Sequence, residues 1–86
     1  MKRVKWPSGA IEAIPEDGEL FIVDDGIGTR CKVEKFAVDG RYWKGTGKYE
    51  WRCVLHTSQG VLLSGVSEDY QAIVELMERD IERCKA

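Results

Sequence analysis

The densest group of side chains able to bind a partner lies in residues 41–52, where basic and aromatic residues alternate around a glycine-rich centre. The segment reads Arg-Tyr-Trp-Lys-Gly-Thr-Gly-Lys-Tyr-Glu-Trp-Arg. Tryptophan, tyrosine and arginine dominate the binding energy of protein interfaces, and the same residue types stack on nucleobases and contact phosphates. The segment therefore predicts a binding surface. Its candidate residues are Arg41, Tyr42, Trp43, Lys44, Lys48 and Arg52.

A second candidate surface is acidic and lies on a predicted C-terminal helix. Four glutamates project away from the apolar side of that helix, at positions Glu68, Glu75, Glu78 and Glu82. One interpretation is a solvated face, on which Glu75 and Arg79 form a favourable i,i+4 pair. The other is an anionic ridge for a basic partner, with carboxylates that imitate the phosphate spacing of a nucleic acid.

Residues that could support catalysis or metal binding are few. His56 is the only histidine, and no nucleophile lies in an elbow motif beside it. Cys31, Cys53 and Cys84 are odd in number and far apart, which is typical of buried thiols rather than of disulfides or a zinc site. The two Gly-x-Gly pairs lack the third glycine of a phosphate loop. We therefore expect a protein that is not an enzyme and has no metal or cofactor.

The charge distribution is uneven along the chain. The formal net charge is −2, yet residues 30–52 contain seven basic and three acidic residues, a local charge of +4. Tight nonspecific DNA binding needs many phosphate contacts, so this pattern favours a directed contact instead. The apolar runs are far too short to span a membrane, and residues 6–9 interrupt what would be a signal peptide. We expect a cytoplasmic location.

The order of turns and apolar patterns predicts one small domain built on a sheet. Residues 1–10 are expected to be loose, except that Trp6 is expected to fold back and cover apolar surface. Short strands are expected at residues 11–13 and 20–23. A longer strand follows at residues 31–38, with a bulge near Glu34 and Lys35. Turns at residues 14–18 and 24–29 separate these strands.

The segment after the third strand has two interpretations. Asp39-Gly40 is a hairpin signal, so residues 41–44 either pair as a separate strand or belong to a projecting loop over residues 39–48. The next strand alternates clearly, with Tyr49, Trp51, Cys53 and Leu55 on one face. Residues 61–66 form the closing strand.

The chain ends in a predicted helix that Ser67 caps. Its apolar stripe consists of Tyr70, Ile73, Val74, Met77, Ile81 and Cys84. The predicted fold is α+β: an antiparallel sheet of four or five strands with meander connections, covered on one face by the C-terminal helix.

Two likenesses bear on the function. Residues 49–86 give a strand, strand and helix with a Gly65-x-Ser67 step, which resembles the DNA-binding arms of phage-type integrases over less than half of the chain. The sheet face of those arms is basic, whereas this chain has the acidic Glu50 there, so no functional residue of the integrases is assigned to this chain. In class and composition the chain also looks like phage-encoded inhibitors of host defence systems, the anti-CRISPR-like proteins.

Two functions follow from the sequence. The first is a non-catalytic protein-binding module, of the kind that viruses or mobile elements encode against a host nucleoprotein, using the aromatic hairpin, the acidic helix or both. The alternative is a nucleic-acid-binding domain that uses the basic hairpin alone. Overall acidity favours the first. The sequence leaves the partner's identity and the oligomeric state open.

Overall fold

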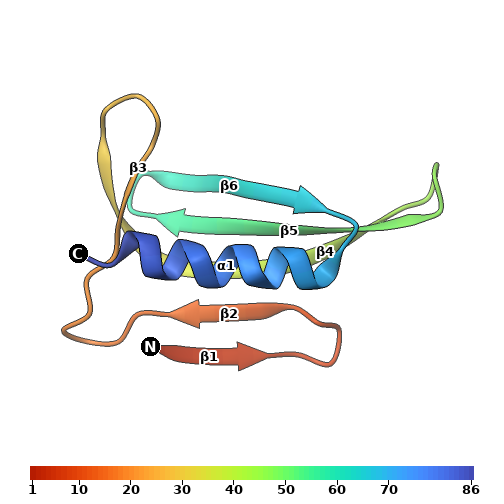
Figure 1. The fold of residues 1–86 in the computed structure, drawn as a ribbon, viewed down its shortest axis with the longest axis horizontal. Coiled ribbons are helices and arrows are strands. Elements are labelled where there is room, and N and C mark those ends of the chain that lie inside the picture. Colours follow the sequence, from red (N-terminus) through yellow and green to blue (C-terminus); the bar gives the residue numbers. More distant parts are fainter.

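A computed structural model describes all 86 residues and contains six strands and one helix (Figure 1). The elements are β1 (Lys2–Lys5), β2 (Ile11–Ile14), β3 (Ile22–Asp24), β4 (Arg30–Trp43), β5 (Lys48–Thr57), β6 (Gly60–Ser67) and α1 (Tyr70–Cys84). The predicted α+β class, with an antiparallel sheet and one C-terminal helix, is confirmed. The sheet has one strand more than the largest number expected.

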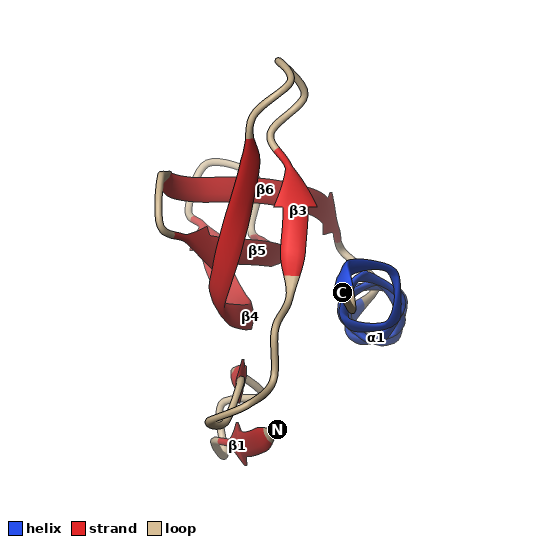
Figure 2. Ribbon diagram, turned by 90° about the vertical axis from the view of Figure 1, so that its left-hand side faces the viewer, coloured by secondary structure: helices blue, strands red, loops and turns tan.

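The strand order is β1-β2-β4-β5-β6, and β3 pairs separately with the beginning of β4. Every pairing is antiparallel. The register between β4 and β5 shifts between Val33 and Lys35, which confirms the predicted bulge. In Figure 2, β3 and β4 run steeply across β5 and β6. Residues 30–32 of β4 pair with β3, whereas residues 36–38 pair with β2 on one side and β5 on the other.

The prediction that residues 1–10 are loose is wrong. Residues 2–5 pair with β2 in a continuous register from Lys2 opposite Ile14 to Lys5 opposite Ile11. Backbone pairing creates this strand, whose side chains are mainly basic and show no apolar periodicity. Met1 packs against the core, and its amino group lies 2.6 Å from a carboxylate oxygen of Glu19.

The predicted turn at Asp39-Gly40 is also wrong, because β4 continues through it to Trp43. Arg41 to Trp43 pair with β5, as the strand interpretation of residues 41–44 expected, but they continue β4 and do not form a separate strand, and Lys44 lies in the turn. The chain reverses at residues 44–47 instead. Gly40 does not have the positive φ angle that a type I′ turn requires.

The N-cap of the helix is Asp69, two residues after the predicted cap Ser67. The carboxylate of Asp69 accepts a hydrogen bond from the backbone N–H of Ala72 at 3.3 Å. Ser67 instead accepts a bond from the N–H of Asp69 at 3.0 Å. The predicted apolar stripe is buried at Ile73, Met77, Ile81 and Cys84, with Tyr70 and Val74 half-buried. Asp80 is buried beside them, which the stripe did not predict.

The core lies between α1 and one face of the sheet (Figure 1). Phe36 and Val38 of β4 lie opposite Leu55 and Cys53 of β5, so the predicted alternation of β5 is confirmed. All three cysteines are buried, as expected. The single helix is neither long nor apolar enough to cross a membrane.

Candidate binding surface

The β4–β5 arm, defined here as residues 41–50, extends past the beginning of α1 (Figure 1). Tyr42 lies opposite Tyr49, and Trp43 opposite Lys48. The turn closes with a hydrogen bond of 2.8 Å from the N–H of Gly47 to the carbonyl of Trp43. The predicted binding segment is therefore a paired ribbon with two side-chain faces, and only its tip is a loop.

One face of the arm begins an aromatic row that runs into the body of the molecule. Its members are Tyr42, Tyr49, Trp51 and Tyr70, whose ring centroids lie 6.5, 5.0 and 4.5 Å apart in that order. Tyr42 is 57% exposed and Tyr49 44% exposed, whereas Trp51 and Tyr70 pack against the core. The row therefore anchors two exposed rings to the core through two half-buried ones.

The other face of the arm holds Trp43. The guanidinium of Arg41 lies 5.4 Å from the centroid of its ring, and the indole Nε1–H donates a hydrogen bond of 3.1 Å to Glu50. The ring is 44% exposed. These two contacts hold an exposed indole in one orientation, so its free side is available to a partner.

Carboxylates accompany most of the basic candidates. Lys48 lies 3.3 Å from Glu68, and Arg52, on the sheet below the arm, lies 3.1 Å from Asp39. Arg41 lies directly opposite Glu50 in the ribbon. Lys44, at the turn, has no ion pair. The basic segment predicted from the sequence is thus largely balanced by nearby acidic groups.

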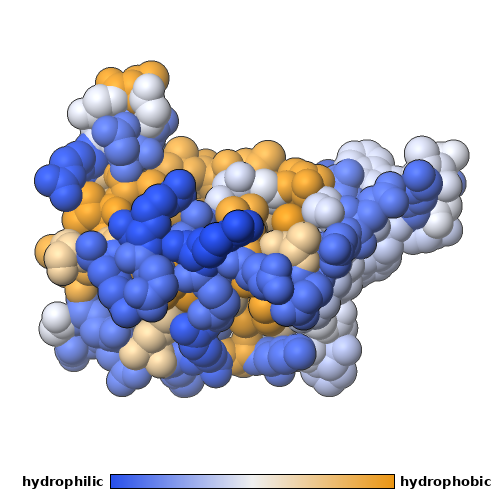
Figure 3. Space-filling model, in the orientation of Figure 1, coloured by the Kyte–Doolittle hydropathy of each residue, from blue (hydrophilic) through white to orange (hydrophobic).

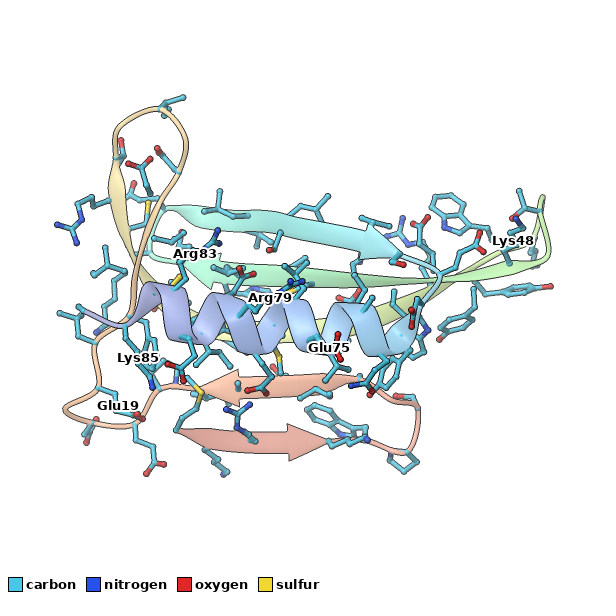
Figure 4. All side chains as sticks on the ribbon, viewed as in Figure 1. Glu19, Lys48, Glu75, Arg79, Arg83 and Lys85 are labelled. Atoms are coloured by element: carbon cyan, nitrogen blue, oxygen red, sulfur yellow. The ribbon has the colours of Figure 1, made fainter.

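The acidic candidates on and before α1 are balanced in the same way. Glu68 pairs with Lys48, Glu78 with Arg3 of β1 and Glu82 with Lys85. Glu75 has no ion pair, and the expected pair between Glu75 and Arg79 is not formed, although both side chains lie on α1 (Figure 4). The four glutamates are exposed but do not form a continuous unpaired ridge.

A hollow of about 680 Å³ lies where the aromatic row meets the turn after β1. Trp6, Trp51 and Tyr70 line it, together with Lys5 and Pro7. The hydroxyl of Tyr70 donates a hydrogen bond of 2.7 Å to the carbonyl of Gly9, which fixes the turn against the row. Sequence reasoning missed this hollow, because residues 1–10 were expected to be loose. The signal in the sequence was Trp6, which was expected to fold back onto apolar surface; its ring lines the hollow and is 42% exposed.

Asp80 is a buried carboxylate whose hydrogen bonds connect α1 to β5 and β6. Its carboxylate accepts hydrogen bonds from Ser64 of β6, from Arg83 at 2.7 Å and from the thiol of Cys53 at 3.8 Å. Burial, followed by the nearby Asp80 carboxylate, raises the pKa of Cys53 to about 12, so this thiol is not an activated nucleophile. His56 lies on the opposite face of β5 and does not join the cluster.

These contacts leave the arm, the aromatic row and the hollow as the surface with the most exposed aromatic area. The resemblance to integrase arms rests on residues 49–86 alone. Comparison with protein-family models, curated proteins and solved structures gives no match for this chain, so any assignment of function rests on the geometry of this surface.

Proposed function

We propose that this chain is a non-catalytic protein-binding module that grips its partner with the β4–β5 arm and the aromatic row. The observation that supports this most directly is the pairing of charges around exposed aromatic rings. Tyr42, Trp43 and Tyr49 are between 44% and 57% exposed. Arg41, Lys48 and Arg52 already face carboxylates, so the aromatic rings provide most of the unused binding capacity.

The rings are also ordered before any partner arrives. Trp43 is held between Arg41 and Glu50, and Tyr49 packs on Trp51. Ordering a side chain on binding costs about 0.5–1.5 kcal/mol, so rings that are already fixed lose less when a partner docks. Rigid aromatic anchors of this kind are the side chains that most often carry interface energy.

The same geometry favours protein over nucleic acid as the partner. A phosphate backbone would have to draw Lys48 from Glu68 and Arg52 from Asp39, and the acidic residues would stay beside it. Lys44 alone among the basic candidates has neither an ion pair nor a carboxylate opposite it in the ribbon. A viral or mobile-element inhibitor of a host nucleoprotein is one form that this function takes, with the protein component as the contact.

Site-specific photo-crosslinking tests the proposal. A photoreactive phenylalanine replaces Tyr42 on the arm or, as the matched control, Ile27, which is 87% exposed in the turn before β4. In a cell lysate treated with nuclease, position 42 should yield a discrete protein adduct that position 27 does not. An adduct at position 42 that nuclease removes would instead identify nucleic acid as the partner. Identical adducts at both positions would contradict a specific arm.

A further inference from the structure

The hollow at the end of the aromatic row is formed before any ligand enters it. Two backbone hydrogen bonds of 2.9 Å close the turn after β1, from the N–H of Gly9 to the carbonyl of Trp6 and from the N–H of Trp6 to the carbonyl of Ala10. Gly9 fits against Trp51, because a Cβ at position 9 would lie 2.9 Å from Cη2 of that ring. The turn, the sheet and the start of α1 therefore hold Trp6, Trp51 and Tyr70 around one space.

The side chains around the hollow offer more hydrogen-bond donors than acceptors. The indole N–H groups of Trp6 and Trp51 donate no hydrogen bond within the protein, and that of Trp51 is not sealed from solvent. The ammonium group of Lys5 has no ion pair. No carboxylate or amide side chain lines the hollow. A ligand that supplies acceptors but few donors therefore fits best.

The charge beside the hollow disfavours a cationic ligand. Three aromatic rings around one space can bind a quaternary ammonium group. Here, however, the ammonium of Lys5 already lies 6.0 Å from the centroid of the Tyr70 ring, so a second cation would be repelled and a carboxylate attracted. In Figure 3 the turn after β1, at the lower right, is pale, the colour of residues that are neither strongly hydrophilic nor strongly hydrophobic. The occupant should therefore combine an uncharged body with an acidic group.

We propose that the hollow and the aromatic row bind a proline-rich segment of the protein partner, with a carboxylate of that segment beside Lys5. Because the segment belongs to the partner of the proposed function, its existence rests on that proposal. Proline has a carbonyl but no backbone N–H, which matches a hollow whose free side-chain groups are mainly donors. A polyproline II helix makes no internal hydrogen bonds, so its carbonyls are free to accept from the indoles. Aromatic-lined grooves bind such segments.

The aromatic row extends the hollow in a direction that a repeating segment can follow. Trp51 and then Tyr49 follow Tyr70 at centroid distances of 4.5 and 5.0 Å, and Tyr42 lies 6.5 Å from Tyr49. A polyproline II helix rises about 3.1 Å per residue, so about six residues are enough to reach from the hollow to the arm. A single partner side chain in the hollow would leave the two exposed tyrosines without a contact.

Titration with synthetic peptides tests this segment. The first peptide is Pro-Pro-Glu-Pro-Pro-Glu-Pro-Pro with both ends capped; the second has alanine for every proline, and the third has glutamine for both glutamates. In heteronuclear NMR spectra, the first peptide should shift the indole N–H signals of Trp6 and Trp51. The signal of Trp43, whose N–H is bonded to Glu50 on the other face of the arm, should stay in place. The alanine peptide should bind at least about tenfold more weakly, because it is not preorganised.

Variants of the hollow test the same contacts from the protein side. Trp6→Ala should weaken binding of the first peptide at least about tenfold, because it removes one wall of the hollow. Ile27→Ala, at an exposed site in the turn before β4, should leave this binding unchanged.

The charge of Lys5 is tested without removing a ring. Lys5→Ala should weaken binding of the glutamate peptide about two- to fivefold and leave that of the glutamine peptide unchanged. Lys2→Ala removes the same charge at the other end of β1 and should affect neither peptide.

Three results would overturn the proline-rich segment. The first is equal binding of the proline and alanine peptides, and the second is no binding of either at millimolar concentration. The third is a shift of the Trp6 and Trp51 signals by single-stranded oligothymidine and not by the proline peptide, which would make the hollow a site for nucleobases. The photo-crosslink at position 42 tests protein binding separately. If that adduct forms while the proline peptide fails, the chain binds a protein through a segment of another kind.

Discussion

The ring of Tyr49 lies over the backbone of Gly40, in the space where any other residue would carry its Cβ atom. A Cβ built on Gly40 would lie 2.9 Å from Cζ of Tyr49 and 2.9 Å from Cζ3 of Trp51. Real Cβ atoms essentially never approach other heavy atoms this closely. The missing side chain therefore lets two rings cross β4, and the aromatic row is continuous because position 40 is glycine.

Gly40→Ala should consequently destabilise the fold and break the aromatic row. Forcing a methyl group into a filled site costs about 1–3 kcal/mol. We expect a loss of this size in urea unfolding, together with a changed near-ultraviolet circular dichroism spectrum. Gly45→Ala is the control, because a Cβ there has nothing within 4 Å. Equal losses in both variants would contradict the packing role of Gly40.

This relationship also explains why the predicted turn failed. Asp39-Gly40 matches a hairpin signal locally, because glycine tolerates a positive φ angle. Here the glycine serves a contact with residues 49 and 51 on the neighbouring strand, and the chain stays extended. A sequence pattern over four residues carries no information about rings nine to eleven positions away.

Other parts of the site were predictable to different degrees. The composition of residues 41–52 located the arm, and helical spacing located the buried face of α1. Ion pairs such as Lys48 with Glu68 depend on how the arm and the start of the helix meet in space, so the sequence overestimated the free positive charge. The hollow beside Trp6 and the burial of Asp80 were missed because both depend on contacts between residues distant in the chain.

Trp43 and Trp51 should respond oppositely to truncation. Trp43→Ala removes an exposed ring from the arm, so the melting temperature should change little while partner affinity falls by about 2 kcal/mol or more. Trp51→Ala removes a ring packed on the core and should cost about 3 kcal/mol of stability. Thermal unfolding measures the stability of both variants, and titration with the partner identified by photo-crosslinking measures their affinity. Unfolding of the Trp43→Ala variant would place that ring in the core.

Asp80 should be the most sensitive polar residue of the helix. Asp80→Ala leaves the hydroxyl of Ser64 and the thiol of Cys53 without their acceptor, in a site where Asp80 is only 2% exposed. Losing one partner of a buried charged network costs about 3 kcal/mol. Glu82→Ala, which removes an exposed ion pair with Lys85, should cost less than about 0.5 kcal/mol. Urea unfolding distinguishes them, and similar losses would argue against the network.

The buried thiol of Cys53 predicts a loss of stability in alkali. Burial raises its pKa from 9.0 to about 12 in the folded protein, so the folded state holds the proton over a range where the unfolded state releases it. The associated stability is complete below pH 9.0 and is lost as the pH rises towards about 12. Cys53→Ala should show a shallower decline over this range. Parallel curves for the two proteins would contradict the assignment.

Salt dependence should separate the two candidate partners. A nucleic acid held through about four phosphates gives a log–log slope of binding against salt near −3 to −4. A protein partner bound through Tyr42 and Trp43 should give a much shallower slope, because salt screens interactions between charges and has little effect on contacts between apolar surfaces. Replacing Lys44 and Lys48 by alanine should then change the slope little.

The matched control replaces Lys2 and Lys32, which are exposed and lie outside the arm, by alanine. It removes the same charge without touching the arm, so any general effect of net charge appears in both double variants. A steep slope that flattens only when Lys44 and Lys48 are removed would mean that phosphates bind the arm directly. The ion pair of Lys48 with Glu68 would then have to open on binding, and the protein-binding proposal would fail.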